Sequence, residues 1–109
     1  MGNNLYSFIG LMKKSGRLSS GDDAVEYDIK KGKSRLIIIA EDASENTKKR
    51  FVDSARYRGI PFVYFGTKEH LGSHIGKSST AVLSVNDDGF ANAFVKKMND
   101  NGGADIVKS

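Results

Sequence analysis

An outward helix face that carries a tyrosine and two lysines is the most chemically informative feature of the sequence. In a helix predicted over residues 22–31, Val25 and Ile29 share one side and should enter the core. Residue 27 lies roughly 200° around the helix from residue 25, so Tyr27 should point away from the core. The outward face then carries Asp23, Ala24, Tyr27, Lys30 and Lys31. A tyrosine ring can stack on a base and ammonium groups contact phosphates, so this pattern indicates RNA binding.

The entrance to this helix also favours an anionic or base ligand. Arg17 and Gly21 are predicted to lie at the entrance, where a glycine lets another backbone approach closely. The first N–H groups of a helix have no partner within it and can donate to anions or bases. The same residues also fit a half-packed tyrosine and two solvated lysines, so both interpretations stay open. A further basic group on the next helix is expected to be a solvated face: Lys48, Lys49, Arg50, Arg56 and Arg58.

The stretch from Gly72 to Ser78 resembles a phosphate-binding loop but lacks its spacing and context. Three residues separate Gly72 from Gly76, whereas the P-loop has four between its glycines. A P-loop follows a strand and opens a helix, but this stretch closes a helix and leads into a strand. Nucleotide binding is therefore not predicted here.

Two further groups of side chains could hold a metal ion but are incomplete. His70 and His74 have the i, i+4 spacing of a chelating pair, yet no cysteine exists in the sequence and no third ligand is evident. Glu41 and Asp42 follow a predicted strand, where open α/β sheets place ligands, and are better interpreted as helix-capping acids. No nucleophile elbow or Ser/His/Asp set is recognisable. We expect no catalytic site, metal, cofactor or small-molecule substrate.

The apolar spacing predicts the elements that must position these residues. Spacings of three and four residues alternate with short β-branched runs, which indicates helices alternating with strands. The first predicted helix ends at Gly16, and two others cover 22–31 and 67–75. The remaining two run from Ser44 to Gly59 and from Asp87 or Asp88 to Met98. The predicted extended segments cover 17–20, 36–40, 60–65 and 81–85. The expected fold is α/β: a single-domain, three-layer α/β/α sandwich around a mixed sheet of about four strands.

Length, charge and composition set the broad class of protein. The chain has 109 residues and a formal net charge of +4, which mildly favours an anionic partner. No apolar run approaches the roughly 18 residues that span a bilayer, and residues 1–4 lack signal-peptide features. We therefore expect a cytoplasmic protein with no membrane contact. One domain over residues 1–98, followed by a disordered tail over 99–109, is the predicted organisation.

A longer pattern surrounds the candidate helix and resembles the kink-turn RNA-binding ribosomal protein superfamily. This group includes archaeal and eukaryotic large-subunit proteins and their small bacterial relatives, and the likeness is greatest to its small Firmicute members. The resemblance covers roughly residues 3–98. The segments that carry it are Ser20-Gly21, Ala40 to Thr47, Gly59-Ile60-Pro61, Leu71 to Lys77 and Asp88 to Asn92.

The resemblance implies RNA binding without catalysis, by an α/β/α sandwich. Family members insert the start of the second helix into a sharply bent RNA loop, using a Gly-x-Asn-Glu-x-x-Lys pattern, and add a loop before the last strand. Here the glycine is Gly21, while Asp23, Ala24 and Tyr27 replace the asparagine, glutamate and lysine. Losing a bidentate base contact costs about 1–3 kcal/mol of discrimination, so a related structured RNA, ribosomal or with a bent loop, is the expected ligand.

Residues and resemblance together predict a non-enzymatic RNA-binding protein, with ribosomal proteins as further candidate partners. The predicted RNA-binding residues are Arg17, Ser20, Gly21, Asp22, Asp23, Tyr27, Lys30, Lys31, Gly76, Lys77, Ser78 and Ser79. An alternative is a protein-interaction module of the same fold whose RNA determinants have eroded. A third, weaker alternative is a small phosphate-binding or phospho-acceptor protein that uses Glu41 and Asp42.

Overall fold

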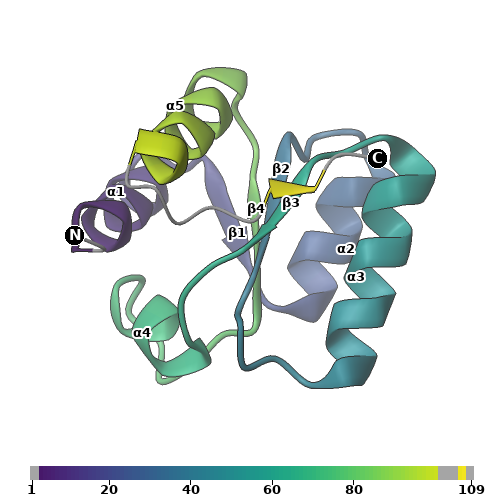
Figure 1. The fold of residues 1–109 in the computed structure, drawn as a ribbon, viewed down its shortest axis with the longest axis horizontal. Helices are drawn as coiled ribbons and strands as arrows, with labels where there is room; N and C mark the ends of the chain where they lie inside the picture. The colour runs from purple at the N-terminus through teal and green to yellow at the C-terminus, as the bar shows by residue number, and fades with distance from the viewer. Residues whose placement is uncertain (1–2, 101–105, 108–109) are drawn as a thin grey trace.

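The computed structural model describes residues 3–100 and 106–107, which form helices and strands in alternation (Figure 1). The helices are α1 (Asn3–Lys14), α2 (Asp22–Lys30), α3 (Glu45–Arg58), α4 (Lys68–Ser73) and α5 (Asp88–Asp100). The strands are β1 (Leu18–Ser20), β2 (Leu36–Ile39), β3 (Phe62–Tyr64), β4 (Val82–Val85) and β5 (Ile106–Val107).

The strands form one mixed sheet in the order β1-β4-β2-β3-β5. Strands β2 and β3 are parallel, while β4 is antiparallel to both β1 and β2. Strand β5 adds a two-residue antiparallel edge to β3. The predicted mixed sheet of about four strands is confirmed, with β5 as a short addition.

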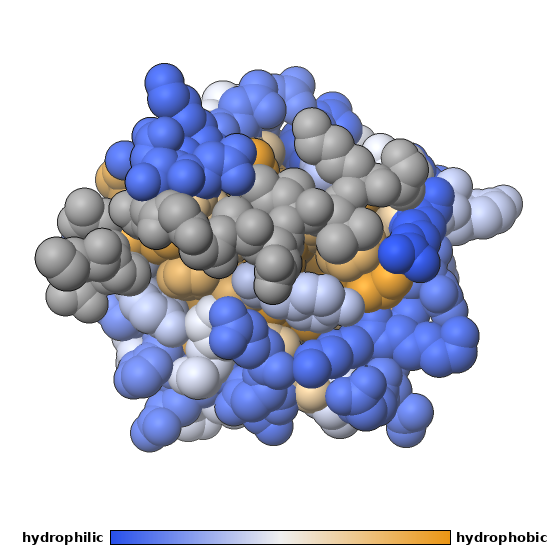
Figure 2. Space-filling model, viewed as in Figure 1, coloured by the Kyte–Doolittle hydropathy of each residue, from blue (hydrophilic) through white to orange (hydrophobic). Residues whose placement is uncertain are grey.

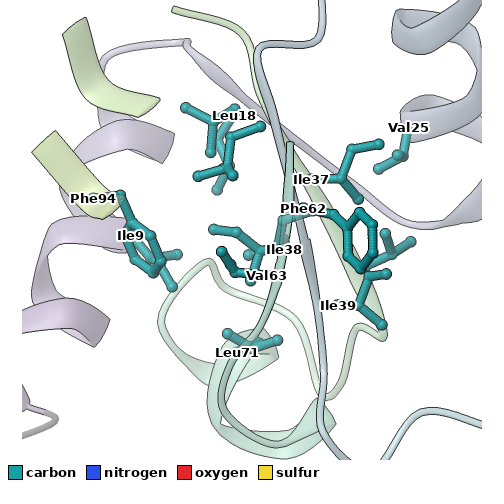
Figure 3. Packing of buried hydrophobic residues seen from close by; sticks show 14 of the residues in the cluster. Ile9, Leu18, Val25, Ile37, Ile38, Ile39, Phe62, Val63, Leu71 and Phe94 are labelled. Carbon is teal, nitrogen blue, oxygen red and sulfur yellow. The ribbon is translucent and has the colours of Figure 1, made fainter. Parts of the chain in front are cut away.

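Helices cover both faces of the sheet, as the sandwich prediction requires. Figure 1 shows α2 and α3 packed side by side on one face, and α1, α4 and α5 on the other. Successive residues of β2 point to opposite layers: Ile37 and Ile39 lie on the side of Val25, and Ile38 on the side of Leu71 (Figure 3). All five side chains are sealed from solvent. A strand buried on both faces accounts for the uninterrupted apolar run predicted as a central strand.

The ends of the helices follow from local chemistry. Ser44 caps α3, since its Oγ accepts a hydrogen bond from the Thr47 N–H at 3.1 Å. Gly59 ends the same helix in the left-handed region at φ 68°. Asp87 accepts from the Phe90 N–H at 2.9 Å and so begins α5. These three boundaries agree with the predicted ones.

The structure describes two stretches of the C-terminal segment, 99–100 and 106–107. Asn99 and Asp100 complete the last turn of α5, two residues beyond the predicted end. Ile106 and Val107 form β5 at the edge of the sheet. The other residues of the predicted tail, 101–105 and 108–109, lie outside the described residues.

The surface in the view of Figure 1 is mixed in character. Figure 2 shows hydrophobic residues along the middle of this face and hydrophilic residues around its margins. Among the described residues, no helix is long and apolar enough to cross a membrane.

Candidate nucleic-acid interface

Helix α2 begins with a glycine whose backbone no other residue adopts easily. Gly21 has φ 91° and ψ 157° and supplies no side-chain cap to the first turn. Its N–H donates to the Val82 carbonyl at 3.1 Å, which fixes the turn against β4. A Cβ added at Gly21 would have no atom within 4 Å. The start of α2 is thus open, and first-turn N–H groups that lack a side-chain cap are available to a ligand.

The loop over residues 76–79 leads into β4 at the end of the sheet where α2 begins. Strands β1 and β4 pair antiparallel with Ser20 opposite Leu83, so the end of β1 meets the segment that enters β4. Gly76 turns the chain at φ 80°, and the side chains of the three residues that follow it are exposed. We call Ser20–Asp23 together with Gly76–Ser79 the helix-start surface.

Helix α4 holds this loop closely through a glycine. The Lys77 N–H donates to the Gly72 carbonyl at 2.9 Å, and the Thr80 N–H donates to the Lys68 carbonyl at 3.0 Å. A Cβ at Gly72 would come within 2.5 Å of the Ser79 Cα, so no larger residue fits without moving the loop. This packing role explains the glycine that resembled part of a phosphate loop.

An arginine from α3 pairs with two of the three carboxylates near the helix start. Arg50 Nη1 lies 3.4 Å from Asp22 Oδ2, and Arg50 Nη2 contacts Glu26 Oε1. Asp23 and Lys77 have no ion pair with any described residue. The defined surface thus holds two carboxylates and one lysine, and Asp22 shares Arg50 with Glu26, so the helix start has no excess of positive charge.

The outward face of α2 agrees with the predicted one. Val25 and Ile29 are buried, while the Tyr27 side chain is 55% exposed. Two ammonium groups lie near its ring, Lys31 Nζ at 5.6 Å and Lys33 Nζ at 5.7 Å from the centroid. An exposed ring beside two cations can offer a stacking platform to a base and nearby charge to its phosphate.

Two of the predicted site residues lie elsewhere or have other partners. The sequence predicts Arg17 at the entrance of α2, but its carbonyl accepts from the Asn86 N–H at the far end of β4. Since β1 advances about 3.3 Å per residue, Arg17 and Gly21 lie at opposite ends of the sheet. Lys30 is exposed and pairs with Glu26 at 3.6 Å, near the C-terminus of α2. The structure thus brings together the helix-start residues and separates Arg17 from them.

The side chains considered for metal or phosphate chemistry have structural partners. His74 Nδ1 lies 2.9 Å from the His70 carbonyl, and its ring stacks on Tyr6 at 5.0 Å. Asp42 Oδ1 accepts from the Lys68 N–H at 2.8 Å, at the start of α4, which agrees with the interpretation as a capping acid. Within residues 3–100, no three His, Asp or Glu side chains gather as metal ligands.

Arg50 is a residue that sequence reasoning missed. The sequence predicts it on a solvated face of α3, yet it reaches across to two carboxylates of α2. Asp22 and Arg50 are 28 positions apart, so no helical spacing indicates the contact.

Comparison with known proteins identifies the family to which the chain belongs. The ribosomal protein L7Ae/L30e/S12e/Gadd45 family matches residues 3–95, most of the chain. The chain belongs to this family. The predicted resemblance to the kink-turn RNA-binding superfamily is confirmed.

Two relatives and one solved structure are similar to the chain over most of its length. The chain is 33% identical over 90 residues to the RNA-binding protein YlxQ of Bacillus subtilis, covering 83% of this chain and 90% of YlxQ. It is 32% identical over 93 residues to large ribosomal subunit protein eL8 of Picrophilus torridus, covering 80% and 72%. A solved structure of a Bacillus halodurans protein of unknown function matches with TM-score 0.83 and 29% identity, covering 87% and 96%. YlxQ and eL8 are an RNA-binding and a ribosomal protein, not enzymes, in agreement with the prediction of a non-catalytic protein.

Proposed function

We propose that this member of the L7Ae family binds a structured RNA through the helix-start surface and the outward face of α2. The observation that carries the proposal is the pairing of β1 with β4, because it puts the start of α2 at the end of the sheet where the loop over residues 76–79 leads into β4. Family membership and the RNA-binding relative YlxQ support the same ligand class. The cytoplasm and a ribosomal RNA are the expected setting, with ribosomal proteins as further partners.

Binding would use three kinds of contact. The first-turn N–H groups beyond Gly21 donate to RNA oxygens, because no side chain caps them. The Tyr27 ring stacks on an unpaired base, and Lys31 beside it contacts the adjoining phosphate. Lys77 adds an exposed cation from the loop. Arg50 keeps the carboxylates of α2 from repelling the RNA backbone.

The departures from the family pattern determine which RNA fits. Asp23 accepts hydrogen bonds from a guanine but cannot donate as an asparagine amide does. Ala24 has no carboxylate to contact a base, and Tyr27 replaces a cationic donor with a ring. We infer a bent internal loop in which an unpaired base can reach Tyr27, rather than the standard kink-turn alone.

The double substitution Tyr27→Ala with Lys31→Ala tests this function. Stacking contributes about 1–3 kcal/mol per base, so affinity for a kink-turn RNA probe should fall about 5- to 150-fold at fixed salt. Both side chains are exposed, so the variant should keep its thermal unfolding midpoint. The measurement is fluorescence anisotropy with labelled RNA.

A matched control removes one exposed tyrosine and one exposed lysine from α3. Tyr57 is 86% exposed and Lys49 is exposed on the same helix, so Tyr57→Ala with Lys49→Ala should leave RNA affinity unchanged. Equal binding by the α2 variant and the wild-type chain would exclude this face. A partner that stays bound after ribonuclease treatment, and no longer binds the α2 variant, would instead favour protein docking.

A further inference from the structure

A polar cleft lies at the end of the sheet opposite the helix-start surface. It has a volume of about 520 Å³, within the range of small-ligand sites. Two backbone hydrogen bonds shape it, from the Asn86 N–H to the Arg17 carbonyl at 2.9 Å and from the Arg35 N–H to the Val85 carbonyl at 2.7 Å. We call it the basic cleft, because Arg17, Lys33 and Arg35 line it.

The floor of the basic cleft is a fixed polar network. Asn86 Nδ2 donates to Asp28 Oδ2 at 2.8 Å and to the Ser19 hydroxyl at 3.3 Å. Ser84 donates to Asn86 Oδ1 at 2.6 Å from below. Asp28 is only 6% exposed. The Asn86 amide therefore satisfies the Asp28 carboxylate by a hydrogen bond. This hydrogen bond fixes the floor, so Asp28 need not turn toward a cation at the rim.

The three cations at the rim differ in whether they already have a partner in the protein. Arg35 donates to the Gly32 carbonyl at 2.9 Å and lies 3.3 Å from Asp88. Arg17 and Lys33 have no carboxylate within ion-pair distance among the described residues. Both side chains are exposed, so two positive charges at the cleft remain available to an anion.

The basic cleft continues the outward face of α2. Lys33 lines the cleft and also lies over the Tyr27 ring. Nine residues of helix, at 1.5 Å each, place the cleft about 14 Å from the helix start. That length is enough to reach several successive phosphates along one strand of a nucleic acid stem.

We propose that the basic cleft is a second RNA contact, which holds the phosphodiester backbone of the stem next to the bent loop. Arg17 and Lys33 bind the phosphate oxygens, and Arg35 is held at the rim by Asp88. This inference rests on the proposed RNA-binding function and extends its footprint along α2. It predicts a contact that depends on stem length and on charge but not on base sequence.

The double substitution Arg17→Gln with Lys33→Gln tests the cleft in the 109-residue chain. Removing one phosphate contact lowers the slope of log affinity against log salt by about 0.9, so removing two lowers it by roughly 1.8. Between ~50 and ~200 mM salt, wild-type affinity should therefore fall about tenfold more than that of the variant. The probe is a kink-turn RNA whose flanking stems are about ten base pairs long.

Two controls separate a defined contact from general electrostatics. Lys96→Gln with Lys97→Gln removes the same charge from α5, in the opposite layer, and should keep the wild-type slope. With the stem shortened to about two base pairs, the cleft variant and the wild-type chain should bind alike. An unchanged slope in the cleft variant, or an equal loss on long and short stems, would overturn the proposal.

A third arm distinguishes an RNA backbone from a free phosphate ligand. Adenosine 5′-monophosphate at millimolar concentration is titrated while the backbone amide signals of Arg17 and Asn86 are followed by NMR. Saturable shifts, together with an unchanged salt slope for RNA, would assign the cleft to a free nucleotide and overturn the proposal. Loss of RNA binding only on substitution of Tyr27 would leave the proposed function standing and remove the cleft from it.

Discussion

The two ends of α2 are built by different means. At the helix-start surface, backbone conformation sets the shape: Gly21 turns the chain at φ 91°, and Gly72 lets the loop backbone pack against α4. At the basic cleft, side chains set the shape: Asn86 forms the hydrogen bonds of the floor, and cations line the rim.

This difference indicates that the two surfaces contribute to RNA affinity in different ways, one by shape complementarity and the other by charge. The helix-start surface has no excess of positive charge, because Asp22 shares Arg50 with Glu26 and Asp23 has no ion pair among the described residues, so attraction to phosphates cannot dominate its contribution. The basic cleft presents the exposed cations Arg17 and Lys33, so its contribution should weaken as salt rises. Substitutions at the two ends should therefore differ in kind as well as in size.

The largest effect is expected from Gly72→Ala. The new Cβ would meet the Ser79 Cα at 2.5 Å, and the obstructing atoms are backbone, so the loop must move. Overpacking of this kind costs about 1–3 kcal/mol of unfolding free energy. Displacing the loop from the start of α2 should also lower RNA affinity more than tenfold, at low and high salt alike. Urea unfolding and anisotropy measure the two effects.

Gly89→Ala is the matched control for that substitution. It adds the same methyl group to the exposed first turn of α5, where the Cβ meets only the Asp87 carboxylate at 3.2 Å. RNA affinity should be unchanged. If Gly72→Ala bound RNA normally, the position of the loop would not matter to the helix-start surface.

Asn86→Ala should have the next largest effect, on stability. It removes the amide donor from the nearly buried Asp28 and an acceptor from Ser84. Leaving a buried polar group without its partner costs about 1–3 kcal/mol, and more for a charged one. Chemical denaturation should show this loss, whereas Asn92→Ala on the exposed face of α5 should cost little. Undiminished stability would mean that the floor of the cleft is not preorganised.

Arg50→Gln should lower RNA affinity about tenfold at low salt. The substitution leaves Asp22 and Glu26 without the Arg50 cation, and both would then repel RNA phosphates. Screening over about 8 Å at physiological salt should reduce the loss. Adding Asp22→Asn and Glu26→Gln to the same chain should restore binding. Failure of that rescue would show that Arg50 contacts the RNA itself.

Most of the fold was predictable because its boundaries are set locally. Ser44 and Gly59 delimit α3 through a hydroxyl cap and a left-handed turn, which the residue types alone indicate. The exposure of Tyr27 followed from its angle to Val25 around the helix.

What sequence reasoning missed depends on contacts between distant segments. Arg17 and Gly21 are close in sequence, but a three-residue strand between them puts them at opposite ends of the sheet. The ion pair of Arg50 with Asp22 joins separate helices, and Asn86 meets Asp28 across 58 positions. No spacing within one element encodes these contacts, because they arise from the packing of α2 against α3 and β4.

The smallest effect is expected from Asp23→Asn, and its sign is opposite to the others. Asp23 is an exposed carboxylate without an ion pair among the described residues, so its removal relieves repulsion of RNA phosphates. The new amide also provides N–H donors that a carboxylate lacks. Affinity for a kink-turn probe should rise by roughly two- to tenfold, at a cost of about 0.3–1 kcal/mol in stability because a first-turn acid is removed.

The salt dependence of this gain separates its two sources. A gain that disappears at high salt would come from charge alone, whereas one that persists would come from a base contact by the amide. The gain should be the same on long and short stems, because Asp23 lies at the helix start and not at the basic cleft. Asp53→Asn on α3, where Lys49 pairs with the carboxylate at 3.0 Å, should not raise affinity. A gain confined to long stems would mean that the two ends of α2 do not act separately.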